Sequence, residues 1–228
     1  AAPSSGDQTS SARPSTDTAA ASAASPSPLR ISLDELRIAD MQASFDDQAV
    51  APAAQLVARL EHLSAKDIVI DPANPGGAVT IDGLATLPGV IETIRWNGTV
   101  SPFAQERRAA IALRAEGIRP DALEPYLKLA GLASELENGL FTARLDAVST
   151  TSGDRATTTA RIREIRFADG DATWLEMATA EVSGLSINPA DGAIHVRAIE
   201  IAGPTINLQR DADGALHVFG LKTLPADE

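Results

Sequence analysis

Alternation of apolar and polar residues is the sequence feature that most restricts how this chain can fold. Residues 108–116 and 140–148 both show it, with apolar residues at every second position: Ala109, Ile111, Leu113, Ala115, Phe141, Ala143, Leu145 and Ala147. A period of two is typical of a strand with one apolar face. Short apolar runs bounded by Gly, Pro, Asn and Asp recur at 79–81, 90–100, 162–167, 174–182, 194–201 and 205–208. The sequence therefore predicts a mainly β, mostly antiparallel fold.

Two segments show a helical spacing. Residues 121–129 begin with an acidic residue after Pro120, and their apolar residues lie three and four apart, which predicts a short helix. In residues 53–63, Leu56, Val57, Leu60 and Leu63 fit a helix, whereas Leu56, Ala58 and Leu60 fit a strand. Periodicity leaves that segment undecided, so we expect one or two short helices.

A heptapeptide occurs twice near the end of the chain. Residues 190–196 and 212–218 are the same except for Ile194 in the first and Leu216 in the second. Each copy contains Asp-Gly between alternating apolar residues, which predicts two hairpins with Gly192 and Gly214 at positive φ, and a four-strand meander over residues 185–219. By the same reasoning, Asn97-Gly98 is expected to mark a turn or a strand end.

Composition divides the chain into three parts. Of the 28 residues in 1–28, 23 are Ala, Ser, Thr or Pro, and none is a large apolar residue, so this segment is expected to be a disordered linker. Residues 29–221 are expected to form one β-rich domain, and residues 222–228 a tail. The chain contains no run of about 18 apolar residues, which excludes a membrane-spanning helix within it.

The residues that could carry chemistry have simpler structural explanations. The chain has no cysteine, no Gly-x-Ser-x-Gly motif and no phosphate-binding loop. The segment from Asp211 to Gly214 resembles the start of a calcium loop, but Leu221 and Lys222 stand where the liganding Glu should be, so a turn is the better interpretation. His195 and His217 are expected on strand surfaces. We expect no enzyme, no catalytic residue, no metal site and no cofactor, and the net charge of −12 argues against a nucleic-acid partner.

Three stretches together resemble a known family. They are Trp96-Asn-Gly-Thr-Val100, then Arg119-Pro-Asp-Ala-Leu-Glu-Pro-Tyr-Leu127, then Asn138-Gly-Leu140. Residues 201–216, which contain Gly203-Pro204 and Asp213-Gly214, are similar to the end of a repeat in the same family. Over residues 31–221 the chain resembles the AsmA-like envelope proteins, and most closely their domain-of-unknown-function subgroup.

The resemblance implies a fold, a location and a function. AsmA-like proteins are similar to TamB and to bridge-like lipid-transfer proteins, whose long curved antiparallel sheets carry lipid on an apolar face. It implies an open or partly closed gutter in the periplasm, binding or conducting the acyl chains of phospholipid or another lipid between bacterial membranes. The chain would be a fragment of a longer protein anchored in the inner membrane, with the anchor outside this sequence. A non-transporting structural or docking module of a larger envelope protein is the alternative.

The alternating residues give the candidate lipid contacts. Small residues such as Ala109 and Ala143 on the same strands would leave room for a ligand. A closed sandwich, in which the same residues form an ordinary core, remains open at this point. The candidate lipid-binding residues are Ile111, Leu113, Phe141, Leu145, Ile194, Val196, Ile206 and Leu208.

Overall fold

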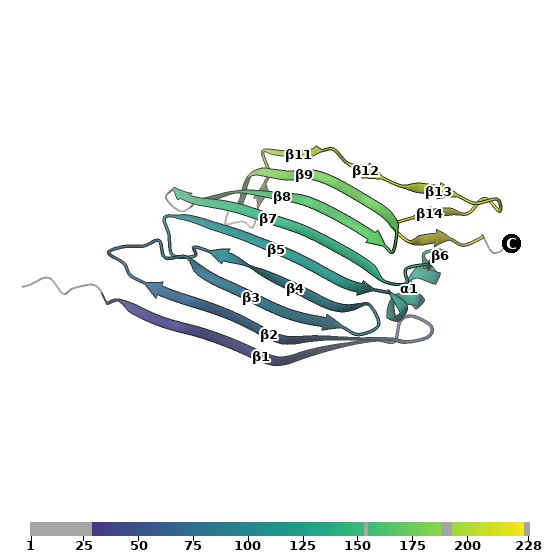
Figure 1. The fold of residues 1–228 in the computed structure, drawn as a ribbon, viewed down its shortest axis with the longest axis horizontal. Helices are drawn as coiled ribbons and strands as arrows, with labels where there is room; N and C mark the ends of the chain where they lie inside the picture. Colours follow the sequence, from purple (N-terminus) through teal and green to yellow (C-terminus); the bar gives the residue numbers. More distant parts are fainter. Residues whose placement is uncertain (1–28, 153–154, 188–192, 226–228) are drawn as a thin grey trace, which may run out of the picture.

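The large antiparallel sheet that dominates the fold is a single curved layer (Figure 1). The computed structural model describes residues 29–152, 155–187 and 193–225. Within them the large sheet has 11 strands, the first eight in the order β1-β2-β3-β4-β5-β7-β8-β9. Their bounds are β1 Ile31–Asp47, β2 Ala54–Ile70, β3 Val79–Leu87, β4 Ile91–Val100, β5 Glu106–Ile118, β7 Gly139–Ser152, β8 Arg155–Asp169 and β9 Ala172–Ile187. Each neighbouring pair in this series is antiparallel, so the expected mainly β, antiparallel fold is confirmed.

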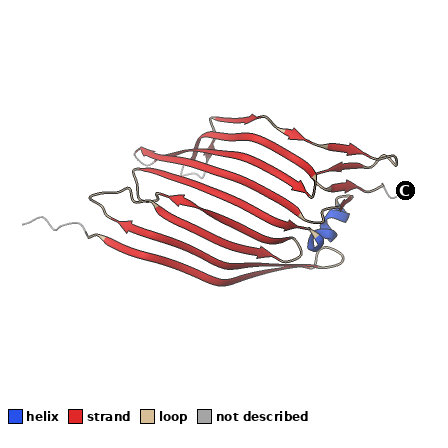
Figure 2. Ribbon diagram, in the orientation of Figure 1, coloured by secondary structure: helices blue, strands red, loops and turns tan. Residues whose placement is uncertain are grey.

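Within the residues that the structure describes, helical structure is confined to the connection between β5 and β7. A 3-10 turn, Asp121–Leu123, leads into α1, Glu124–Leu129, which has Pro125 in its first turn and ends at Ala130. The helix expected over residues 121–129 is therefore confirmed. In Figure 2 the helical residues lie together at one end of the strands. α1 packs on the 3-10 turn and on β6, Leu132–Ser134.

One interrupted strand forms the second edge of the large sheet. Its pieces are β10 Ile194–His195, β11 Ala198–Ala202 and β12 Thr205–Ile206, and all three pair with β9. The predicted four-strand meander is therefore wrong, because residues 194–206 run along one neighbour without folding back on themselves. The first predicted hairpin is present as a strand pair, because β9 and the next strand, β10, pair antiparallel, but Gly192 lies outside the described residues.

The second predicted hairpin is present in a small sheet of its own. β13, Leu208–Arg210, pairs with β14, Leu216–Val218, around the loop that contains Gly214 at φ +87°. The side chain of Asp211 accepts hydrogen bonds from the backbone N–H groups of Asp213 and Ala215, so this segment is a turn. β15, Leu221–Thr223, pairs with β14 and β6. The last strand therefore extends beyond residue 221, where the domain was expected to end.

The alternation of side chains between the two faces shifts by one residue where β1 and β2 bulge together. On one face of β1, Leu33 is followed by Leu36, and Ile38 by Met41, so two polar or small residues separate successive apolar ones. By register the unpaired Asp34 faces Asp67 of β2, and Asp40 faces Glu61. Asp40 and Asp67 have φ of +56° and +62°, and Figure 1 shows β1 and β2 bending along their length. Such bulges restore each strand's apolar residues to one face after a bend.

The bulge near Glu61 settles the segment that periodicity left undecided. Residues 54–63 belong to β2, and the spacing of three between Leu60 and Leu63 spans the bulge, where the register with β3 also shifts. A second expectation is wrong. Asn97 and Gly98 lie inside β4, where they pair with β3 and β5, because the bounding turns fall at residues 88–90 and 101–105.

The described residues enclose almost no core. Their buried apolar residues are Ala54, Val79, Val90, Ala115, Ala143 and Ala168, and no large side chain is fully buried. Two stacked sheets would bury Leu, Ile and Phe between them. The closed sandwich is therefore excluded for this part of the chain, and the large sheet is not closed.

Candidate functional site

One face of the large sheet is apolar from edge to edge. Residues directly opposite each other on neighbouring antiparallel strands point to the same side, so the pairing can be followed strand by strand. The row through Leu145 crosses nine strands, and every residue in it is apolar: Leu36, Ala65, Ile81, Gly98, Ile111, Leu145, Ile162, Ala180 and Ile201. The row through Phe141 is similar: Met41, Leu60, Ala85, Ile94, Ala115, Phe141, Phe167, Leu175 and Ile206. We call the side of the sheet that carries these rows the apolar face.

Trp96 lies between these two rows, opposite Gly83 on β3 and Leu113 on β5. A Cβ placed on Gly83 would stand 2.1 Å from Cζ2 of Trp96, so the indole ring occupies the space over the glycine. The ring covers β3 at the point where β3 has no side chain. Trp96 and Gly83 therefore keep this part of the apolar face continuous.

The apolar face is accessible, and most accessible at its two edges. On β1 the exposed fractions are 49% for Leu36, 56% for Met41 and 56% for Phe45, and on β11 Ile199 is 65% exposed. Side chains nearer the middle, such as Leu145, are partly buried by their neighbours in the sheet. Among the described residues no second sheet packs over this face, and helical residues reach it at one end, where the 3-10 turn contacts β2 and Tyr126 hydrogen-bonds to Asp47. Exposed apolar area on this scale indicates a binding surface.

The opposite face is a network of ion pairs between strands. Arg163 pairs with Asp146 on the neighbouring strand at 2.6 Å, and Arg161 Nε donates to Glu181 at 2.6 Å. Arg114 and Arg95 both approach Glu116, at 2.8 and 3.3 Å. The hydrogen bond from Arg114 lowers the pKa of Glu116. We call this side the polar face, and many of its charged side chains are paired.

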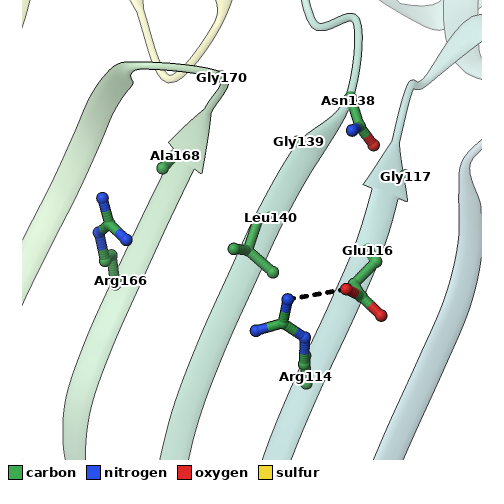
Figure 3. A pocket seen from close by; sticks show the side chains of 9 residues that line it. All are labelled: Arg114, Glu116, Gly117, Asn138, Gly139, Leu140, Arg166, Ala168 and Gly170. Atoms are coloured by element: carbon green, nitrogen blue, oxygen red, sulfur yellow. Dashed lines mark hydrogen bonds and ion pairs between the residues drawn. The ribbon is translucent and has the colours of Figure 1, made fainter.

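A shallow depression of about 240 Å³ lies on the polar face near the ends of β5, β7 and β8 (Figure 3). Arg114 and Arg166 reach into it beside Gly139. Both guanidinium groups are already engaged, Arg114 with Glu116 and Arg166 with Glu176 at 3.4 Å and Thr173 at 3.1 Å. The depression therefore offers no uncompensated charge and no nucleophile with a neighbouring base.

The structure brings together five of the eight candidate residues. Ile111, Leu113, Phe141, Leu145 and Ile206 all point to the apolar face. By register Ile194, in β10 opposite Ile187, also points to the apolar face, but it lies at the far end of β9; Val196 lies in the break between β10 and β11. Leu208 is not in the large sheet, because it pairs with Val218 in the small one.

Sequence reasoning missed the β1 and β2 part of the apolar face. Its residues include Leu36, Ile38, Met41, Leu60 and Leu63, which the bulges space unevenly along the chain. The signal that could have found them is a pair of apolar residues three apart with an acidic residue between them. That signal occurs at Leu33–Leu36, Ile38–Met41, Leu60–Leu63, Ala65–Ile68 and Ile162–Ile165.

No helix within the described residues has the length and apolar character needed to cross a membrane. The described residues thus offer an accessible apolar face, an ion-paired polar face and one short helix at the end of the strands. Comparison with protein-family models, with curated proteins and with solved structures finds no match to this chain.

Proposed function

We propose that the apolar face binds lipid acyl chains and lets them lie across the strands. The observation that carries this proposal is the continuity of the rows through Leu145 and Phe141, which contain no polar residue between β1 and the edge strand. An acyl chain needs no hydrogen-bonding partner, and these rows offer none. The resemblance to AsmA-like proteins supports the same ligand class.

The dimensions of the apolar face suit an acyl chain. The row through Leu145 spans nine strands, and eight spacings of roughly 4.8 Å give about 38 Å. One leaflet of a bilayer has a hydrocarbon thickness of about 15 Å, half of the roughly 30 Å core. The row is longer than one acyl chain, so a lipid could shift along it and remain in apolar surroundings. Each Å² of apolar area removed from water contributes about 25 cal/mol.

The strand backbones favour a lipid tail over an extended peptide on this face. Inner strands such as β5 and β7 use their N–H and C=O groups to pair with both neighbours. An extended peptide lying on the face would have to leave its own backbone groups unpaired in apolar surroundings, which is costly. We extend the proposal to the setting that the resemblance implies, a longer membrane-anchored protein of the bacterial periplasm that moves lipid between membranes.

Two aspartate substitutions on neighbouring strands test the proposal. Leu145→Asp places a carboxylate in the middle of the apolar face, and Ala112→Asp places one on the polar face, opposite Arg144. Both positions are partly buried, so the pair is matched for exposure. Binding of a photoactivatable C16 fatty acid is measured by crosslinking yield, and folding by circular dichroism and Tm.

We expect the parent chain and Ala112→Asp to crosslink to the fatty acid with equal yield. The crosslinking yield of Leu145→Asp should be at least tenfold lower, although this variant stays folded. Leu145 is partly open to solvent, so a carboxylate there can stay hydrated and need not unfold the sheet. Absence of crosslinking in the parent chain, or equal crosslinking in both variants, would reject the proposal and favour a non-transporting structural module.

A further inference from the structure

The outer edge of β1 is a long strand edge that nothing in the described residues covers. β1 has 17 residues and pairs only with β2. Its apolar side chains are exposed where the large sheet ends, as at Ile38 and Met41. Free edges of this length bind further strands unless the chain blocks them.

The other edge of the large sheet is blocked in the way such edges usually are. It consists of the short pieces β10, β11 and β12, with Gly203 at φ +61° and Pro204 between the last two. Proline donates no hydrogen bond, and short broken strands are poor templates. The two edges are therefore not equivalent, and β1 is the one suited to pairing.

The pattern of β1 is symmetric about Arg37. If a second β1 runs antiparallel with its Arg37 opposite the first, each residue of the apolar face meets another residue of that face: Leu36 meets Ile38, Leu33 meets Met41, and Ile31 meets Ala43. The polar-face residues meet one another in the same way, for example Glu35 with Ala39. A shift by one residue would place apolar side chains opposite polar ones.

The bulges obey the same symmetry. In the register centred on Arg37, Asp34 of one copy faces Asp40 of the other. Between β1 and β2, the bulged pairs are Asp34 with Asp67 and Asp40 with Glu61. In each pair one residue, Asp67 or Asp40, has a positive φ and its partner does not. Asp40, at φ +56°, facing Asp34 reproduces that arrangement. Each bulge of β1 would therefore lie opposite a bulge of the second copy, as it lies opposite a bulge of β2 within the chain.

Charge on the polar face is compatible with this register. The two Arg37 side chains lie opposite each other, which is unfavourable, but each also has Glu35 of the other strand as its diagonal neighbour. Glu35 already accepts a hydrogen bond from Ser64 Oγ at 2.8 Å and lies 3.9 Å from Lys66 Nζ, and in this register it also comes within diagonal reach of the other copy's Arg37. Both residues are exposed and can adjust their side chains.

We propose that two copies of this chain associate through the outer edges of their β1 strands, antiparallel and centred on Arg37. The partner is a second copy because the strand's own pattern of apolar residues and bulges is self-complementary. Pairing in this register continues the apolar face from one copy into the other. It depends on the edge of the sheet and not on lipid binding.

Single cysteine variants of the full chain test the register, since the chain has no cysteine of its own. Opposite residues in an antiparallel pair have Cα atoms about 4.5 or 5.5 Å apart, within the range that a disulfide bridges. Arg37→Cys lies opposite itself in the dimer and is expected to form disulfide-linked dimers on mild oxidation. Gln42→Cys, on the same face of β1, lies opposite Ser32 and is the matched control.

The expected results are a dimer mass by light scattering, crosslinking of Arg37→Cys at least tenfold above Gln42→Cys, and crosslinking between Glu35→Cys and Ala39→Cys when the two are mixed. A monomer at all concentrations up to 100 µM would overturn the proposal, and so would equal crosslinking of Arg37→Cys and Gln42→Cys. The fatty-acid assay is independent of these results, so either proposal can fail while the other stands.

Discussion

Tyr126 Oη donates a hydrogen bond of 2.7 Å to Oδ2 of Asp47, which ties α1 to the end of β1. The two residues are 79 positions apart in the chain. The hydrogen bond from Tyr126 lowers the pKa of Asp47, and that from the Ala49 backbone lowers it further. Because β1 is an edge strand, this contact is one of the few that fix its end.

We predict that Tyr126→Phe lowers the Tm, and that the difference from the parent chain depends on pH. A lowered pKa in the folded state means that Asp47 stabilises the fold above its unfolded-state pKa, near 3.9, and loses that contribution as pH falls through the folded value. The difference in Tm should therefore be full at pH 6 and shrink below pH 4. An equal difference at pH 6 and pH 3 would contradict this assignment.

The strands could be predicted from sequence where alternation is unbroken, as in β5 and β7. The bulges are what sequence reasoning missed, because two polar residues between Leu60 and Leu63 imitate a helical spacing. Spacing alone does not distinguish the two cases; the acidic residue between the two apolar ones is the local sign of a bulge, and pairing with a neighbouring strand decides the conformation. The shift in alternation at Asp40 and Asp67 was hidden for the same reason.

Alternation also overstated the extent of the apolar face. It continues from Ile206 to Leu208, yet the backbone N–H of Asn207 makes a last contact with the carbonyl of Trp174 on β9, and Leu208 joins the small sheet. That departure depends on pairing with β14, a long-range property of the fold. The expectation of an open sheet came from the resemblance to AsmA-like proteins, because composition and alternation fit an open sheet and a closed core equally.

Gly83→Ala is predicted to destabilise the sheet because Trp96 occupies the space of the new methyl group. The added Cβ would stand 2.1 Å from the indole ring, and overpacking of this kind costs about 1 to 3 kcal/mol. Gly77→Ala is the control, since its Cβ would meet Val69 at an ordinary 3.7 Å. Urea unfolding measures both. If Trp96→Leu fails to reduce the cost of Gly83→Ala in the double variant, the ring is not the cause.

The bulge at Glu164 gives a prediction about backbone conformation. Glu164 has φ +53° inside β8, and its side chain pairs with Arg144 at 2.8 Å. Glu164→Val should cost roughly 1 kcal/mol or more, since β-branched residues resist positive φ. Glu164→Gly loses only an exposed ion pair and relieves the strain. The urea midpoint of Glu164→Gly should equal or exceed that of the parent chain, and that of Glu164→Val should be the lowest. A valine variant as stable as the glycine variant would contradict the bulge at this position.

His217 joins the small sheet to the loop before it, and its contacts make stability depend on pH. Nε2 lies 3.1 Å from Asp211 Oδ2, and Nδ1 lies 2.6 Å from Glu135 Oε2. Hydrogen bonds to Asp211 first and Glu135 second raise the pKa of His217. The Lys222 ammonium, 3.0 Å from Asp211, is the other cation of this cluster.

A raised pKa in the folded state fixes the sign of the pH effect. The contribution of His217 is fully present below its unfolded-state pKa, near 6.5, and is lost as pH rises through the higher folded value. We therefore predict that His217→Gln lowers the Tm most at pH 5.5 to 6 and least at pH 9, with the exposed His195→Gln as the control. Asp211 has a lowered pKa and stays ionised throughout this range, so it cannot produce the change. A Tm difference that grows toward pH 9 would mean that the neutral imidazole, not the imidazolium, is the form held between the two carboxylates.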